Sequence, residues 1–247
     1  MINVDAGERE FGDTLDLEFL KYVGEVNIAL GGHAGTPLWS KELAKQALDV
    51  GCMVNLHPGY PDREGFGREV MDMTQLQLTD ALSRQREVLS DVASCKFHGA
   101  LYNQAMVDRA LAELLVEWAS NEGVEQLLVM PDSVLEAVAK EVGISARREG
   151  FLDRRYERKE GGLCLMSRTQ DGAVFHTVDQ CLSQYSGIAE RSAVQLEEGE
   201  WCPISVQTCC LHGDGEVGLE VARQISGIQS EVYQERGMVF PLGDSGD

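Results

Sequence analysis

Short apolar runs alternate with segments of helical periodicity along most of this chain. The runs are four to eight residues long and end at turn residues, a pattern that predicts buried β-strands. They cover residues 2–6, 26–30, 52–56, 94–97, 126–130 and 204–211.

The segments between these runs predict helices, because their apolar residues recur every three or four positions. Thr74 with Gln77, and Ser133 with Glu136, are the helix-start signals of a capping box. Between 145 and 174 the pattern weakens, and we expect short strands around an irregular loop at 157–162. The predicted helices cover 15–23, 36–50, 74–92, 110–120, 133–143, 178–190 and 215–228.

Strands that alternate with helices of this length predict a parallel sheet covered by helices. About seven strand–helix units are present, and the 247 residues match the roughly 250 residues of a β/α barrel. No linker or repeat divides the chain. We therefore expect one α/β domain over residues 1–247, a (β/α) barrel of about seven units with a frayed C-terminal tail.

Four of the five histidines lie at the ends of predicted strands, each followed by small or turn residues. In a parallel barrel all strands end on the same face, where active sites are built. We therefore expect one pocket, to which the first strand and its turn add Asn3, Asp5 and Glu8. His176 lacks this context, and we expect it to be structural. The four histidines are His33, His57, His98 and His212.

Two kinds of chemistry fit such a pocket. Asp5, His33 and His57 form the best trio for a divalent metal, since one carboxylate and two imidazoles can hold an ion that activates water. The same groups can act without a metal as acid and base, because imidazole titrates near neutral pH. The spacing does not separate these alternatives.

Composition narrows the range of partners. Asp and Glu number 41 against 21 Lys and Arg, a net charge of −20, which repels phosphate backbones and anionic membranes. We therefore expect a small-molecule substrate, no nucleic acid and no membrane partner. Seven cysteines without a CxxC pair indicate reduced thiols, and no leader or 18-residue apolar run is evident, so the expected location is the cytoplasm.

Six segments resemble motifs of the LamB/YcsF family, in the same order and over nearly the whole chain. The first is Asn3-Val4-Asp5-Ala6-Gly7-Glu8, and the others follow at the predicted strand ends. They are NIALGGHAGTP at 27–37, HPGYPD with GFGR at 57–68, KFHGALYN at 96–103, Asp153-Arg154 with Arg168, and CLHGD at 210–214.

This resemblance implies a seven-stranded barrel of the glycoside hydrolase/deacetylase type. Bacterial members of the family act as the A subunit of 5-oxoprolinase, which opens the lactam of 5-oxo-L-proline to L-glutamate with ATP and with B and C subunits. The chain has no GxxxxGK[ST] phosphate loop, so the ATP chemistry is expected to involve B- and C-like partner subunits.

The resemblance also implies roles for residues. Lys96 would neutralise an anionic oxygen, Asp5, Glu8 or Asp214 would be the base, and the four histidines would be acids, bases or metal ligands. Arg68 or Arg154 would hold a substrate carboxylate. The expected catalytic residues are Asp5, Glu8, His33, His57, Lys96, His98, His212 and Asp214, and the expected substrate-binding residues are Asn3, Asn27, Arg68, Tyr102, Asn103 and Arg154.

Some positions depart from the family pattern. Gly32 stands where the family has Phe, which is expected to enlarge or reshape the pocket, and Phe97 stands where Pro is usual. A metal-dependent hydrolase of a related cyclic amide or N-acyl substrate is therefore an alternative. A binding subunit without catalysis is another.

Overall fold

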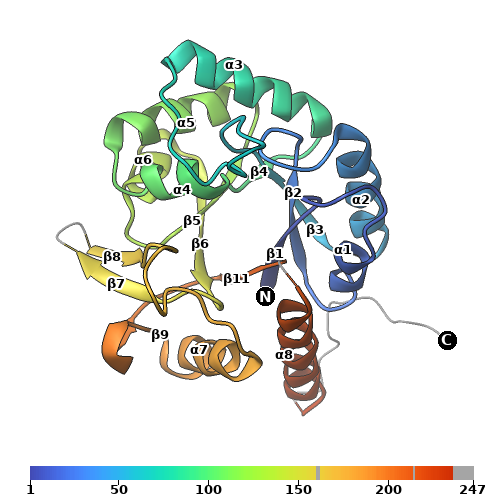
Figure 1. Ribbon diagram of the computed structural model, residues 1–247, viewed down its shortest axis with the longest axis vertical. Helices are drawn as coiled ribbons and strands as arrows, with labels where there is room; N and C mark the ends of the chain where they lie inside the picture. The colour runs from blue at the N-terminus through green and yellow to red at the C-terminus, as the bar shows by residue number, and fades with distance from the viewer. Residues whose placement is uncertain (160–161, 214, 236–247) are drawn as a thin grey trace.

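The computed structural model describes residues 1–159, 162–213 and 215–235, and its centre is a closed barrel of seven parallel strands (Figure 1). Around the barrel the strands follow the order β1-β11-β6-β5-β4-β3-β2, which confirms the predicted fold class. Their bounds are β1 Ile2–Ala6, β2 Glu25–Ala29, β3 Met53–His57, β4 Ser94–Cys95, β5 Gln126–Val129, β6 Ser145–Phe151 and β11 Thr208–His212.

Helices surround the barrel, as Figure 1 shows, and several of their ends match the sequence signals. Thr74 and Gln77 form both hydrogen bonds of the capping box of α3, and Ser133 accepts from Glu136 N at the start of α6. The helices are α1 Thr14–Phe19, α2 Pro37–Asp49, α3 Gln75–Arg86, α4 Gly99–Ala105, α5 Arg109–Asn121, α6 Val134–Val142, α7 Val178–Arg191 and α8 Glu216–Glu235.

Three regions differ from the sequence prediction. Residues 145–151 form one continuous barrel strand, β6, and the short helix α4 was not predicted. The last barrel strand begins at Thr208, not at 204. Two small antiparallel pairs lie outside the barrel: β7 Tyr156–Lys159 with β8 Gly162–Leu165, and β9 Ala193–Gln195 with β10 Trp201–Pro203.

Every strand has an outer and an inner face, because side chains alternate along it. On β1, Val4 pairs in register with Val26 of β2, and both belong to the apolar layer between barrel and helices. The alternate positions Asn3 and Asp5 point into the barrel. This apolar layer supplies the core, and the barrel interior is free to carry polar groups.

Hydrogen-bonded polar side chains run along the barrel interior, and we call them the polar column. Glu25 accepts from Arg147 Nη1 at 2.6 Å and from Thr208 Oγ1 at 2.8 Å. Thr208 Oγ1 accepts from Asn3, Asn3 Oδ1 accepts from Asn27, and Asn27 Nδ2 also donates to Asp5 Oδ1 at 2.8 Å. The column consists of Arg147, Glu25, Thr208, Asn3 and Asn27, and it ends on Asp5.

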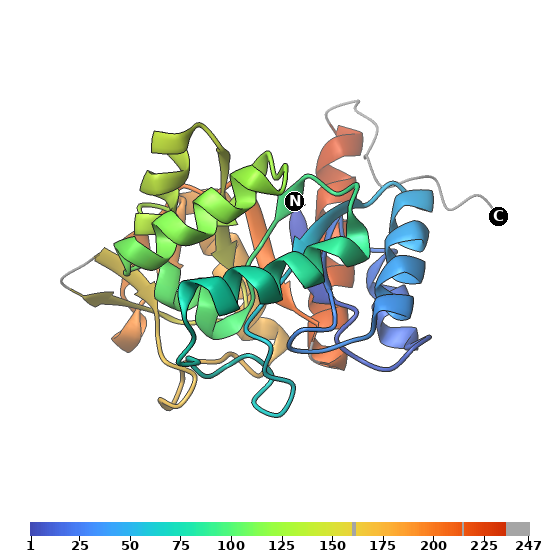
Figure 2. The same cartoon turned by 90° about the horizontal axis from the view of Figure 1, so that it is seen from above.

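Loops 58–73 and 166–176 project on the same side of the barrel, at the bottom of Figure 2. Within the described residues, none of the helices has the length and apolar character needed to cross a membrane.

Candidate active site

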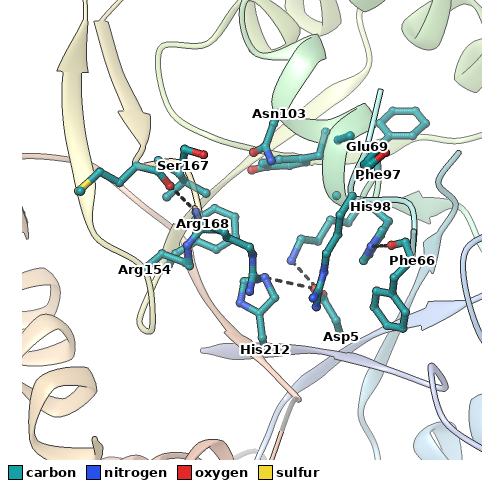
Figure 3. A pocket seen from close by; sticks show the side chains of 18 of the residues that line it. Asp5, Phe66, Glu69, Phe97, His98, Asn103, Arg154, Ser167, Arg168 and His212 are labelled. Atoms are coloured by element: carbon teal, nitrogen blue, oxygen red, sulfur yellow. Dashed lines mark hydrogen bonds and ion pairs between the residues drawn. The ribbon is translucent and has the colours of Figure 1, made fainter. Parts of the chain in front are cut away.

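A cavity of about 560 Å³ opens at the C-terminal ends of the barrel strands. Asp5 of β1 and His212 of β11 line it from below in Figure 3, and His57 of β3 lines it as well. The loop that carries Phe66 and Arg68, the start of α4, and residues 165–169 after β8 form its walls. The predicted convergence of strand ends is therefore present.

Asp5 is the central buried carboxylate, with 5% of its surface exposed. Its Oδ1 accepts from Asn27 Nδ2 at 2.8 Å and from Lys96 Nζ at 3.0 Å, and its Oδ2 lies 3.5 Å from His57 Nε2. Burial by itself would raise the pKa of Asp5, but attraction to His57 and Lys96 outweighs burial and holds the pKa well below its ordinary value. Asp5 is therefore ionised at neutral pH.

Lys96 is the cation that compensates this charge, and it is 2% exposed. Its Nζ lies 3.0 Å from Asp5 Oδ1, 3.3 Å from Glu149 Oε2 and 2.9 Å from Cys210 Sγ. Burial would lower the pKa of Lys96, but the negative charge of Asp5 raises it well above its ordinary value. Lys96 is thus a fixed ammonium at the bottom of the cavity.

Three histidines and Glu8 form a cluster beside Asp5. Glu8 Oε1 lies 3.2 Å from His33 Nε2, 3.3 Å from His98 Nδ1 and 3.9 Å from His57 Nε2. His57 Nε2 and His98 Nδ1 are 2.9 Å apart. The rings of His33 and His98 stack, with their centroids 3.7 Å apart and their planes 4° from parallel.

Backbone carbonyls orient two of these rings. His57 Nδ1 lies 2.8 Å from the Lys96 carbonyl oxygen, and His98 Nε2 lies 2.9 Å from the Phe66 carbonyl oxygen. A carbonyl only accepts, so each of these nitrogens carries a hydrogen and donates it. Gly67 permits the close packing, because a Cβ there would come within 2.8 Å of His33 Cβ and the residue has a φ of +63°.

Burial affects the three rings differently. It lowers the pKa of His33, and it lowers the pKa of His98 further with the help of repulsion from His33. For His57 burial also favours the neutral ring, but attraction to Asp5 outweighs it and raises the pKa. His33 and His98 are therefore neutral near pH 7.

Asp153 and His212 form a second pair at the end of β11. His212 Nδ1 donates to Asp153 Oδ2 at 2.8 Å, and His212 Nε2 lies 3.9 Å from Asp5 Oδ2. Burial would raise the pKa of Asp153, but attraction to His212 outweighs it and lowers the pKa. The carboxylate fixes the ring so that Nε2 faces the cavity.

Two arginines line the opposite side of the cavity, as Figure 3 shows. Arg154 is 4% exposed, and it donates from Nη2 to the Met166 carbonyl oxygen at 2.6 Å and from Nε to the Ala173 carbonyl oxygen at 3.4 Å. Burial and repulsion from Arg168 lower the pKa of Arg154 to about 10. The Asp153 carboxylate attracts both guanidinium groups, and two guanidinium groups that line one cavity also favour an anionic group of a substrate.

The structure brings most of the predicted site residues to this cavity. His33 is 1% exposed and lies behind its wall, in contact with Glu8. Asn3 and Asn27 belong to the polar column below the cavity, so they support Asp5 and do not reach a substrate in the cavity. Asp214 lies outside the described residues, and His176 is exposed. The predicted residues that line the cavity are Asp5, Glu8, Arg68, His57, Lys96, His98, Tyr102, Asn103, Arg154 and His212.

The structure groups the candidate metal ligands differently from the trio expected from the sequence, Asp5, His33 and His57. Among the described residues, the ligand atoms that lie within 4.8 Å of one another belong to Glu8, His33, His57 and His98. Asp5 falls into a separate group with Cys210 and His212. The reason is that the turn after β1 carries Glu8 over the histidines, whereas Asp5 points at Lys96.

The expected enlargement of the pocket at Gly32 is absent. A Cβ at Gly32 would overlap the Gln85 side chain, which fills this space. Gln85 is 5% exposed, accepts from Gly59 N at 3.1 Å and donates to the Gly59 carbonyl oxygen at 2.9 Å. The smaller residue therefore makes room for a glutamine that holds the loop after β3.

Sequence reasoning gave no role to several residues of the site. Asp153 and Arg168 lie in a segment that carries the family resemblance, so their position in the motif was an available signal. Glu149 lies on β6, a strand that was not predicted as one element because charged residues interrupt its apolar pattern. Phe66 acts through its carbonyl oxygen, which no side-chain pattern reveals.

Known proteins with similar sequences or structures cover nearly the whole chain. The sequence model of the LamB/YcsF family matches residues 1–241. A protein of Thermococcus onnurineus (strain NA1), named as the A subunit of 5-oxoprolinase, is 32% identical over 256 aligned residues, which cover 98% of this chain and 97% of that protein. The crystal structure of the lactam utilization protein from Thermus thermophilus superposes with a TM-score of 0.79 at 26% identity and 98% coverage of both chains.

Proposed function

This chain belongs to the LamB/YcsF family, and we propose that it binds and opens 5-oxo-L-proline as the A subunit of an ATP-hydrolysing 5-oxoprolinase. Its partners in this proposal are B- and C-like subunits. The names of the two similar proteins, the A subunit of a 5-oxoprolinase and a lactam utilization protein, support this choice of substrate class.

The observation that carries the proposal is the division of charge in the cavity. Arg154 and Arg168 line it from the segments after β6 and β8, and Asp5, Lys96 and His212 line it at the ends of β1, β4 and β11. 5-Oxoproline has the same division, with a carboxylate at one end of a five-membered ring and a lactam carbonyl at the other. Bidentate binding of the carboxylate by a guanidinium would direct the carbonyl toward Lys96 and His212.

Ring opening adds water across the C–N bond of the lactam. The oxygen of water attacks the carbonyl carbon, and His212 Nε2 takes the proton from the water. The C–N bond then breaks, and the same proton passes to the ring nitrogen. Asp153 keeps His212 in the required tautomer, while the Lys96 ammonium stabilises the negative charge on the carbonyl oxygen.

These groups alone do not make an amide carbonyl reactive enough for attack by water. In the proposal, ATP supplies this activation. The sequence has no GxxxxGK[ST] loop, so we assign ATP turnover to the complex with the partner subunits and not to this chain alone. Transfer of the ATP γ-phosphoryl group to the carbonyl oxygen would release ADP and create an anionic group that suits Lys96, and this group would leave as phosphate after the C–N bond is broken.

The test is the formation of L-glutamate from 5-oxo-L-proline and ATP by this chain combined with B- and C-like subunits. His212→Asn should lower kcat by about 10²- to 10⁴-fold. Arg168→Gln should raise KM by about 10- to 100-fold and change kcat less. The matched controls are His176→Ala and Arg109→Gln, at exposed positions outside the cavity, and both should behave as the parent protein.

Two results would contradict the proposal. One is a reconstituted complex that binds 5-oxoproline but forms no glutamate, which would favour a binding subunit. The other is vigorous ATP hydrolysis by the isolated chain, which would contradict the assignment of ATP turnover to the complex with the partner subunits.

A further inference from the structure

Three proton acceptors face one another in the cluster beside Asp5. The His57 ring donates its Nδ1 hydrogen to the Lys96 carbonyl oxygen, so in the neutral ring Nε2 is a bare lone pair. The His98 ring donates its Nε2 hydrogen to the Phe66 carbonyl oxygen, so Nδ1 is a bare lone pair. Glu8 Oε1 is the third acceptor.

These three atoms are close enough to need a positive charge among them, either a proton on His57 or a metal ion. His57 Nε2 lies 2.9 Å from His98 Nδ1, and Glu8 Oε1 lies 3.3 Å from His98 Nδ1 and 3.9 Å from His57 Nε2. Two neutral rings have no hydrogen left to join them, and a proton on His57 Nε2 would join only two of the three atoms. Buried acceptors in this arrangement repel one another unless a positive charge lies between them.

The separations fit a metal ion. At a metal–ligand distance of about 2.0–2.1 Å, two ligand atoms are about 2.9 Å apart at a right angle and about 3.4 Å apart at the tetrahedral angle. The separations of 2.9 and 3.3 Å match these two values, and that of 3.9 Å corresponds to a wider angle. Carbonyl oxygens that accept from the far nitrogen of each imidazole are also the usual second layer of a metal site.

The other candidate group already holds a positive charge. Asp5, Cys210 and His212 lie within reach of one ion, but Lys96 Nζ lies 3.0 Å from Asp5 Oδ1 and 2.9 Å from Cys210 Sγ. An ammonium ion thus stands where a metal would bind. Burial also raises the pKa of Cys210 well above its ordinary value, which opposes the thiolate that a metal requires.

His33 supports the cluster and does not join the ligands. Its ring lies parallel to that of His98, so the lone pairs of the two rings cannot point at the same ion. Its Nε2 lies 3.2 Å from Glu8 Oε1, and a hydrogen donated there orients the carboxylate. His33 is a positioning residue in this arrangement.

We propose that Glu8, His57 and His98 bind one divalent cation of the zinc class, with its remaining positions open to the cavity. Two imidazoles and one carboxylate are a ligand set of catalytic zinc sites, in which the open position holds water or substrate. The inference goes beyond the proposed function, because it rests on hydrogen-bond geometry and does not depend on the identity of the substrate.

The direct test is titration of chelator-treated protein with Zn²⁺ by calorimetry. The parent chain should bind one ion per chain. His57→Ala and His98→Ala should each weaken binding by at least about 100-fold, since loss of a group behind a ligand already costs about 10- to 100-fold. His212→Ala, from the other candidate group, should bind Zn²⁺ as the parent does. Circular dichroism checks that each variant is folded.

X-ray absorption of the Zn²⁺-loaded parent chain does not depend on any variant. It should report nitrogen and oxygen neighbours at about 2.0–2.2 Å, including two imidazoles, and no sulfur. A sulfur neighbour would assign the ion to Cys210 and overturn the proposal. Absence of stoichiometric binding, or unchanged affinity in both His57→Ala and His98→Ala, would overturn it as well.

The result can be separated from that of the function test. Zn²⁺ binding without glutamate formation would retain the metal site and remove the proposed function. Glutamate formation by chelator-treated protein that does not bind Zn²⁺ would remove the proposed metal site and retain the proposed function.

Discussion

At the scale of single residues, the Lys96 ammonium decides whether the bottom of the cavity is stable. It is the cation between Asp5 and Glu149, two carboxyl groups that are 5% and 0% exposed. Burial raises the pKa of Glu149, whereas the pKa of Asp5 stays well below its ordinary value. The site therefore keeps one firmly ionised carboxylate, and Lys96 makes that charge tolerable.

Replacing Lys96 by Met should destabilise the fold by about 3–5 kcal/mol, because removal of one partner leaves a buried carboxylate without a cation. The matched control is Lys140→Met. Its ammonium lies 2.6 Å from Glu136 Oε1, but the lysine side chain is 57% exposed, so this change should cost at most about 1 kcal/mol. Urea unfolding of the three proteins measures both effects. Equal losses in the two variants would argue against a compensating role for Lys96.

Two site features at the residue scale lay beyond the reach of sequence reasoning. The sequence placed His57 and His98 at one end of the barrel, but it did not reveal that their rings donate to the carbonyl oxygens of Lys96 and Phe66. It also did not reveal that the carboxylate beside these two rings is that of Glu8 as well as that of Asp5. Both details depend on side-chain direction, which spacing along a chain does not fix.

At the scale of elements, prediction worked where one face of the element is apolar. The capping box of α3 was found because Thr74 and Gln77 stand three positions apart before a periodic segment. Strand β6 was not recognised as one element, because Arg147 and Glu149 point into the barrel while Arg148 between them pairs with Glu136 of α6. Charged residues on both faces of a strand thus remove the signal by which a buried strand is found.

The contact between the turn after β1 and the loop before α2 leads to a prediction. Gly35 has a φ of +71° and is buried, and a Cβ there would overlap the Gly7 carbonyl oxygen next to Glu8. Gly35→Ala should therefore lower stability by more than the roughly 1–2 kcal/mol of backbone strain alone, and it should displace Glu8.

The matched control is Gly51→Ala at the end of α2. Gly51 has a φ of +80° but nothing within 4 Å of the added Cβ, so only the strain applies. Thermal unfolding of both variants compares them directly. A smaller loss in Gly35→Ala than in Gly51→Ala would show that the turn adapts without cost.

At the scale of the whole molecule, the alternation of strands and helices predicted a β/α barrel of about seven units, and the family resemblance predicted the seven strands that the structure shows. The alternation was also sufficient to predict that distant motifs meet, since parallel strands all end on one face. The wall residues after β8 were harder to predict. Arg168 and Met166 reach the cavity from a segment without helical or strand periodicity, so only the motif marked it.

The net charge of −20 should weaken the folded state through repulsion between its carboxylates. Screening by salt reduces this repulsion, with a Debye length that falls from about 30 Å at 0.01 M to about 10 Å at 0.1 M. We therefore expect the Tm to rise when NaCl is increased over this range at pH 7. Calorimetry at several salt concentrations measures it, and a Tm that falls would show that attractive ion pairs dominate.

The closure of the barrel by its first and last strands has a consequence for biosynthesis. Asp5 of β1 pairs in register with His212 of β11, although the two residues are 207 positions apart in sequence. At about 5–20 residues per second, a ribosome needs roughly 10 to 40 s to translate the intervening messenger RNA. Throughout that time one edge of β1 has no partner strand, and the cavity at the strand ends is incomplete.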